Sequence, residues 1–134
     1  MPTGTKKTPS LLLLLIVVLA DQLSKHTIRR SGGFYICNHG IAFGIPIPSE
    51  LFYLAWGIII VSILIFRKRI SRNSIFPVMF VLSGAISNII DRIRFGCVTD
   101  FIDLHIWPVF NLADISITLG ALLILMSWAF RKPR

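Results

Sequence analysis

The sequence predicts an all-α membrane protein with four transmembrane helices and a small extracytoplasmic loop or β element. Two observations support this fold class. The 134 residues are 54% hydrophobic with a mean hydropathy of +0.77, which is too apolar for an ordinary soluble domain. The apolar residues also form four runs, and the longer runs approach the ~20 residues that a helix needs to cross a bilayer. Since the chain is too short for two domains, we expect one integral membrane domain over residues 1–134.

The first two spans are expected at residues 9–28 and 51–66. The first follows a polar segment with two lysines, and it leads into Asp21 and Lys25 without a small-x-small cleavage site. A removable signal peptide usually has such a site, so we expect this span to be uncleaved. Residues 29–50 contain frequent glycine, proline and asparagine, which predict a loop with short strands around residues 34–37.

The last two spans are expected at residues 75–91 and 110–130. Small residues let neighbouring helices approach closely, and the third span contains Ser83, Gly84, Ala85 and Ser87. We therefore expect the third span to be the central helix of the bundle. The fourth span is followed by a basic tail.

Basic residues are distributed unevenly between the two sides of the expected membrane. Four spans place both termini on one side, and that side carries nine basic residues and no acid: Lys6, Lys7, Arg67, Lys68, Arg69, Arg72, Arg131, Lys132 and Arg134. The other side has fewer basic residues, together with every acid and every histidine. The positive-inside rule therefore predicts cytoplasmic termini and an extracytoplasmic cluster of polar chemistry.

The net charge of +8 does not indicate a nucleic-acid-binding protein, because the basic residues lie at the ends of apolar runs, as is typical of membrane proteins. Cys37 and Cys97 lack the spacing of a metal site. Both are expected on the outer side, which leaves a disulfide between them open, but two free thiols are the simpler expectation. The histidines are expected to be interfacial polar residues rather than metal ligands, and the tryptophans membrane anchors rather than site residues: His26, His39, His105, Trp56, Trp107 and Trp128.

Most of the acidic residues lie in one stretch, residues 88–114, between the third and fourth spans. Carboxylates near a membrane are costly to keep dry, so they indicate a functional site. Asp91 adjoins Arg92, which predicts a structural ion pair, and Asp103 is expected to be a solvated loop residue. Asp100 and Asp114 have no basic neighbour within four residues along the chain, so they are the candidates for a coupled pair of carboxyl groups.

Two carboxyl groups held close together cannot easily both ionise, so one keeps its proton while the other is charged. This state suits peptide hydrolysis, because the ionised group activates a water molecule and the protonated group later protonates the leaving amine. No metal or other cofactor is needed. The sequence also lacks the HExxH, GxSxG and GxxxxGK[ST] motifs of other hydrolases and of nucleotide-binding proteins.

Five motifs in order across the chain resemble those of the lipoprotein signal peptidases (signal peptidase II), which are bacterial membrane aspartyl proteases. The motifs begin at Asp21 (DQLSK), Asn38 (NHGIAF), Ser83 (SGAISNIIDR), Val98 (VTDFI) and Phe110 (FNLAD). Members of this family cleave the signal peptide from prolipoproteins just before a cysteine that carries diacylglycerol. The resemblance therefore implies a monomeric enzyme of the bacterial cytoplasmic (inner) membrane that acts on a lipid-modified substrate.

The resemblance also implies a role for each matching residue. Asp100 and Asp114 correspond to the catalytic pair. The expected substrate-binding residues are Asn38, Asn88, Arg92 and Asn111, and the expected supporting residues are Asp21, Lys25, Gly40 and Asp91. The chain departs from the family pattern at Ser87, where glycine is usual, at Thr99, where valine is usual, and in two short outer segments. These segments help to build a cradle over the site in the family, so an altered substrate grip is expected.

Other interpretations stay open on the sequence alone. Asp21 and Lys25 are four residues apart, which suits either an ion pair at a helix end or a substrate contact. Intramembrane polar residues also form ion or proton pathways, so a small transporter or channel subunit is the alternative function, and a purely structural subunit is a third. A pathway needs polar groups along the depth of the spans, whereas here they gather at one end.

Overall fold

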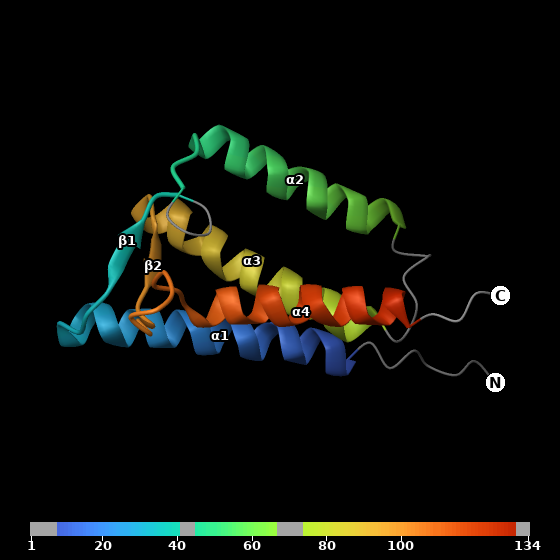
Figure 1. The fold of residues 1–134 in the computed structure, drawn as a ribbon, viewed down its shortest axis with the longest axis horizontal. Helices are drawn as coiled ribbons and strands as arrows, with labels where there is room; N and C mark the ends of the chain where they lie inside the picture. Colours follow the sequence, from blue (N-terminus) through green and yellow to red (C-terminus); the bar gives the residue numbers. More distant parts are fainter. Residues whose placement is uncertain (1–7, 41–44, 67–73, 131–134) are drawn as a thin grey trace.

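The computed structural model describes residues 8–40, 45–66 and 74–130, apart from the side chains of Thr8, Pro9, Ser49 and Phe66. Its elements follow one another along the chain as α1 (Thr8–Ser31), β1 (Ile36–Asn38), α2 (Ser49–Phe66), α3 (Ile75–Phe95), β2 (Val98–Asp100) and α4 (Leu112–Ala129). Helices α1, α3 and α4 lie side by side, and α2 stands apart from them (Figure 1). Both strands lie at one end of this bundle, and α1 begins and α4 ends at the opposite end (Figure 1).

Within the described residues, three helices are long and apolar enough to cross a membrane, namely Ser10–Ser31, Ile75–Phe95 and Leu112–Ala129. The apolar part of α2 is shorter, at Glu50–Ile65. The predicted class is therefore confirmed as a mostly helical membrane protein with a small two-stranded sheet, and three of the four predicted spans meet the length and composition of a membrane span. All four predicted runs are helical, and α1 and α3 extend beyond their predicted ends at residues 28 and 91.

Helix α3 is the central helix, as its small residues predict. Ser83, Gly84 and Ala85 are buried against α4 and its neighbours. Gly84 faces the Ala113 carbonyl so closely that a Cβ atom there would overlap it, and Gly120 of α4 meets the backbone of α3 in the same way. The two helices therefore pack backbone to backbone, an arrangement that only small side chains permit.

The strands β1 and β2 pair antiparallel, with Ile36 opposite Asp100, Cys37 opposite Thr99 and Asn38 opposite Val98. Gly96 makes the connection from α3 possible: its φ of 74° is left-handed, so the chain leaves the helix and enters β2 within two residues. After β2, a bridge between Ile102 and Phe110 closes a loop that returns the chain to the start of α4.

A disulfide joins Cys37 on β1 to Cys97, which precedes β2. The expectation of two free thiols was wrong. Strand pairing is the reason, because it brings the Cα atoms of these residues to 5.4 Å of each other although they are separated by 60 positions in the sequence. No pattern along the sequence reports a contact of this range.

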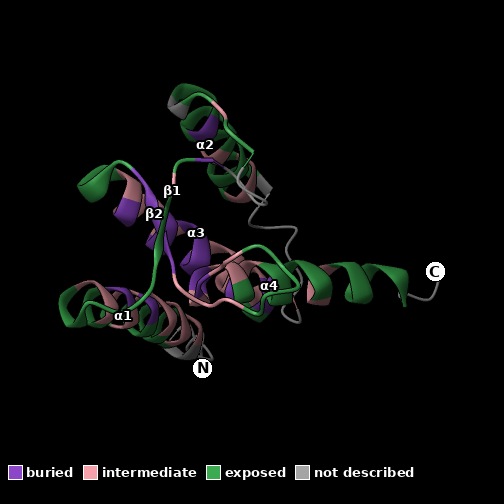
Figure 2. Cartoon of the chain, turned by 60° about the vertical axis from the view of Figure 1, so that its left-hand side comes forward, coloured by how far each residue is buried: buried purple, intermediate pink, exposed green. Residues whose placement is uncertain are grey.

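The interior of the bundle is polar at the end that carries the sheet. Its most buried side chains belong mainly to polar residues, including Asp21, Lys25, Asp91 and Asn111, all at most 2% exposed. The large apolar side chains of α1, α2 and α4 lie outside, and Figure 2 shows buried residues on α3 and β2. This reversal of the soluble pattern is expected when lipid surrounds the helices and polar groups must bond one another.

Candidate active site

Asp100 and Asp114 come together at the end of the bundle that carries the sheet. Asp100 is the last residue of β2, and Asp114 lies in the first turn of α4. Helix α4 begins here because Asn111 caps it: the Asn111 side chain accepts from the Asp114 N–H at 2.9 Å, and the Asp114 carboxylate accepts from the Asn111 N–H at 3.1 Å. This capping box fixes the position of the Asp114 carboxylate.

Asn111 also fixes Asp100. Its side-chain Nδ2 donates to Asp100 Oδ1 at 2.6 Å, while its backbone N–H donates to Asp114 Oδ2. One fully buried residue therefore holds both carboxylates, one through its side chain and the other through its main chain. The predicted meeting of Asp100 and Asp114 rests on this shared partner.

Two more amides complete the set of donors. Asn38 Nδ2 donates to Asp100 Oδ2 at 2.9 Å, and Asn88 Nδ2 donates to Asp114 Oδ1 at 2.9 Å. Each of the four carboxylate oxygens thus accepts one hydrogen bond from an asparagine. Because neutral donors hold the oxygens without supplying a full positive charge, the carboxylates are fixed in place while they remain able to share a proton.

Behind the asparagines lies a buried cluster of charges. Lys25 Nζ lies 2.7 Å from Asp21 and 3.2 Å from Asp91, and it donates to Asn88 Oδ1 at 2.9 Å. Since this donor fixes the amide of Asn88 with its oxygen toward Lys25, the Asn88 Nδ2 group is left to face Asp114. Asp21 and Lys25 therefore form a buried ion pair, which decides between the two interpretations of their spacing.

The cation that pairs with Asp91 is Lys25 and not the adjacent Arg92, so the predicted Asp91–Arg92 ion pair is wrong. Adjacent residues of a helix point in different directions, and Asp91 points toward α1. Asp91 also accepts hydrogen bonds from the Thr99 N–H at 2.9 Å and from Gln22 at 3.0 Å. It therefore joins α1, α3 and β2, which is a structural role.

Arg92 instead faces the cavity at the site. Its guanidinium donates to the carbonyl of Gly40 and lies over the Phe52 ring, with Cζ 3.8 Å from the ring centroid. Its Nε is buried and has no hydrogen-bond partner among the described residues. Arg92 thus joins α3 to the loop after β1 and to α2.

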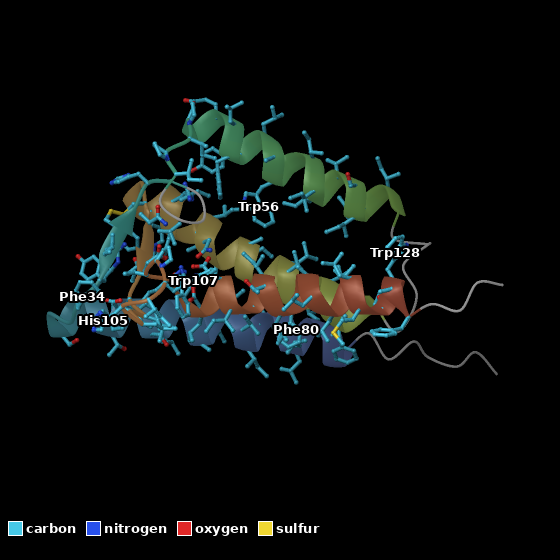
Figure 3. All side chains as sticks on the ribbon, viewed as in Figure 1. Phe34, Trp56, Phe80, His105, Trp107 and Trp128 are labelled. Atoms are coloured by element: carbon cyan, nitrogen blue, oxygen red, sulfur yellow. A yellow bond between two sulfur atoms is a disulfide. The ribbon has the colours of Figure 1, made fainter. Side chains whose placement is uncertain are left out.

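A cavity of about 590 Å³ opens beside the two carboxylates. Its polar lining includes Asp100, Asp114, Asn38, Asn88 and Arg92. Its apolar lining comes partly from α2 and partly from the loop before α4: Phe52, Ala55, Trp56, Ile59, Trp107 and Phe110. Figure 3 shows Trp56 on the side of α2 that faces the other helices. The cavity therefore combines a polar end suited to chemistry with an apolar wall suited to a lipid chain.

Burial raises the pKa of Asp100 to about 6, the nearby charge of Asp114 adds to the rise, and the hydrogen bonds from Asn38 and Asn111 oppose it. A carboxyl group with such a pKa readily gains and loses a proton near neutral pH, which general acid–base catalysis requires.

Several residues at the site were missed in the sequence. Trp56 and Trp107 line the cavity, so their interpretation as membrane anchors alone was wrong. Phe52 and Trp56 are four residues apart on one face of α2, but an apolar helix offers no pattern that separates a cavity wall from a lipid contact. Gln22 and Ser87 were also missed: Gln22 donates to Asp91 and to Ser87, and Ser87 donates to Asp21. Asp103 pairs with His105 outside this network.

A buried and a partly buried carboxyl group beside a cavity, on a bundle of membrane-spanning helices, define the class of a membrane aspartic-type peptidase. Comparison with known proteins specifies the family. The family described as Signal peptidase (SPase) II matches residues 13–130. The chain therefore belongs to the signal peptidase II family.

Similar proteins agree with this assignment. A lipoprotein signal peptidase of Moorella thermoacetica is 37% identical over 93% of this chain and 94% of its own length. One of Halothermothrix orenii is 35% identical over 90% of this chain and 96% of its own length. Among solved structures, a bacterial membrane enzyme determined at 2.3 Å resolution superposes with a TM-score of 0.86 at 26% identity, covering 100% of this chain and 99% of that one.

Proposed function

We propose that the protein is an aspartic endopeptidase that removes the signal peptide from diacylglyceryl-modified prolipoproteins, cleaving just before the lipid-modified cysteine. The family and its lipoprotein signal peptidases support the substrate class. The single observation that supports the chemistry is the arrangement around Asn111, which donates hydrogen bonds to both Asp100 and Asp114. No metal takes part in this mechanism.

Catalysis uses one proton shared between Asp100 and Asp114. The ionised carboxylate takes a proton from a water molecule as the water attacks the scissile carbonyl. The protonated carboxyl group donates a hydrogen bond to the carbonyl oxygen and then gives its proton to the leaving amine. The raised pKa of Asp100 supports this division of roles, because a proton is retained by the pair at a pH where ordinary aspartates are ionised.

The surrounding residues hold the carboxylates and the substrate. Asn38, Asn88 and Asn111 orient the carboxylate oxygens, and Arg92 presents its side chain at the cavity for the substrate backbone. Gly40 accepts from Arg92, and Asp21, Lys25 and Asp91 support Asn88 from behind. These contacts support the roles proposed for these residues.

The acyl chains of the substrate occupy the apolar side of the cavity. Phe52, Trp56 and Ile59 of α2 form part of this side, and Ile117 and Thr118 of α4 also line the cavity. Diacylglycerol stays partly in lipid while the peptide bond beside it reaches Asp100 and Asp114. An unlipidated peptide loses this anchorage, so it binds far more weakly.

In the membrane, a monomer consisting of one domain crosses four times, with α2 as a short span. Both termini lie in the cytoplasm and the sheet lies at the extracytoplasmic face of the bacterial inner membrane. The distribution of basic residues supports this orientation. The short apolar length of α2 suits a helix that is bordered by the cavity and ends near the membrane surface.

The test is turnover of a diacylglyceryl-modified peptide by the purified protein in detergent, compared with the same peptide without lipid. We expect mass spectrometry to detect a product that begins with the lipid-modified cysteine, and at least tenfold slower cleavage of the unlipidated peptide. Absence of cleavage by folded protein would contradict the proposed function. Equal cleavage of both peptides would contradict the role of the lipid.

A further inference from the structure

The sheet carries a second group of side chains with metal-binding atoms, of which two belong to exposed residues and one to the buried Cys97. Cys37, Cys97 and His39 each offer one ligand atom, and these three atoms lie within 4.8 Å of one another. Strand pairing and the disulfide bring Cys97 to Cys37, while His39, two residues after Cys37, places Nε2 3.7 Å from its Sγ atom. None of the three has a role in the proposed peptide hydrolysis.

We propose that, once the disulfide is reduced, Cys37, Cys97 and His39 form a binding site for Zn²⁺. Thiolate and imidazole are the preferred ligands of zinc, with Zn–S bonds of about 2.3 Å and Zn–N bonds of about 2.0 Å. Tetrahedral bonds of these lengths separate a sulfur from a nitrogen ligand by roughly 3.5 Å, close to the spacing already present between Cys37 and His39. Water fills the fourth position.

Replacing the disulfide by zinc takes two steps, reduction and metal binding. A thiol reductant attacks the disulfide and is itself oxidised to a disulfide, which leaves Cys37 and Cys97 as two thiols. Zinc then binds the two sulfurs and the His39 nitrogen, and the two thiol protons are released to solvent. The Cys37 side is exposed to such a reductant, whereas Cys97 is only 1% exposed.

The bound metal replaces one crosslink by another. In the oxidised protein the disulfide ties β1 to the residue before β2. In the reduced protein the zinc ion ties the same two segments together, and it keeps β1 in the position from which Asn38 donates to Asp100. The site therefore preserves the sheet under reducing conditions.

The experiment measures metal binding directly and does not depend on peptidase activity. The full-length protein in detergent is reduced, freed of reductant without air, and titrated with Zn²⁺ and, in a parallel sample, with Co²⁺. We expect about one equivalent of zinc per reduced chain, and with Co²⁺ the absorption bands of a tetrahedral site with sulfur ligands. The oxidised protein should bind neither metal at this site.

Variants assign the ligands. Cys37→Ser/Cys97→Ser should abolish zinc binding, and His39→Ala should weaken it at least tenfold. His26→Ala is the matched control, because His26 lies on α1 outside the cluster, and it should bind like the wild type. Zinc uptake by the reduced wild type that is equal to that of the oxidised wild type would overturn the proposal without any variant. Unchanged affinity in folded His39→Ala would overturn the assignment of His39.

Discussion

Lys25 Nζ donates to Asn88 Oδ1 at 2.9 Å, and this bond leaves the amide nitrogen of Asn88 to donate to the carboxylate of Asp114. Asparagine has two chemically different ends of nearly the same shape, so its orientation must be set by its partners. Lys25 donates only, which leaves the amide nitrogen of Asn88 for Asp114. The hydrogen bond from Lys25 to Asn88 therefore links the buried ion pair, which stabilises the fold, to the geometry of the site.

The first prediction concerns the two carboxyl groups. Asp100→Asn and Asp114→Asn should each lower kcat at least about 100-fold, because an amide neither takes up a proton from water nor donates one to the leaving amine. The measurement is cleavage of a lipid-modified prolipoprotein by variants that elute as the wild type on gel filtration. Asp103→Asn is the matched control, since Asp103 lies in an exposed loop beside His105, and it should keep full activity. Full activity in either site variant would exclude the catalytic pair.

The second prediction concerns the buried ion pairs. Lys25→Met leaves both Asp21 and Asp91 buried without their cation, and an uncompensated buried charge costs about 3–5 kcal/mol of unfolding free energy. We expect a large fall in the thermal unfolding midpoint in detergent. Asp91→Asn should also lower stability more than kcat, by a smaller amount, because Asp21 still pairs with Lys25. Arg30→Met, at an exposed position of α1, is the control, and equal midpoints for Lys25→Met and Arg30→Met would refute the structural role.

The third prediction concerns the contact between α3 and α4. Gly84→Ala places a Cβ atom against the Ala113 carbonyl and against Ile117, so the helices must separate and α4 must shift together with Asp114. We expect reduced stability and reduced activity together. Gly57→Ala of α2 is the matched control, because a Cβ atom there meets nothing within 4 Å. A Gly84→Ala enzyme as stable and active as Gly57→Ala would show that the close contact is not required.

The fourth prediction concerns pH. Because the pKa of Asp100 is raised to about 6, the pair loses its shared proton as the pH rises through that region, and kcat/KM should fall on the alkaline side. Asn38 donates to the ionised form of Asp100 and so lowers this pKa. Asn38→Ala should therefore move the alkaline limb of the pH profile to higher pH. A limb that stays in place, or that moves to lower pH, would contradict the assignment; the Asp103→Asn profile is the reference.

The fifth prediction concerns the disulfide. A crosslink that closes a loop of 60 positions stabilises a folded chain by about 4 kcal/mol in the loop-entropy treatment. Cys37→Ser/Cys97→Ser should therefore unfold at a lower temperature than the oxidised wild type. It should also lose activity, since β1 then holds Asn38 less firmly against Asp100. The comparison is made without added metal, and the same midpoint for both proteins would show that the sheet does not need the crosslink.

The helices and the proximity of Asp100 and Asp114 could be predicted from the sequence for physical reasons, while their catalytic role stays a prediction. Apolar runs of membrane length leave little choice of structure, and Asp100 and Asp114 stood out because no cation adjoins them. Partners across the fold were not predictable. The Asp91–Arg92 pair was inferred from adjacency, whereas the structure pairs Asp91 with Lys25, which lies on another helix. The Cys37–Cys97 bond and the cavity wall formed by Trp56 likewise depend on how distant segments pack.

The bridge between Ile102 and Phe110 separates two parts of the chain that tolerate change differently. Residues inside the bridged loop lie outside the segments that align Asp100 with Asn111, so insertions or deletions there leave that alignment intact. An insertion or deletion between Asn111 and Asp114 would disrupt the site, because the capping box requires a spacing of three residues. Residues 103–106 of this loop are not among those lining the cavity, so they are the place to attach a reporter, whereas Trp107 belongs to the cavity wall. A single added residue between Asn111 and Asp114 would break the capping box.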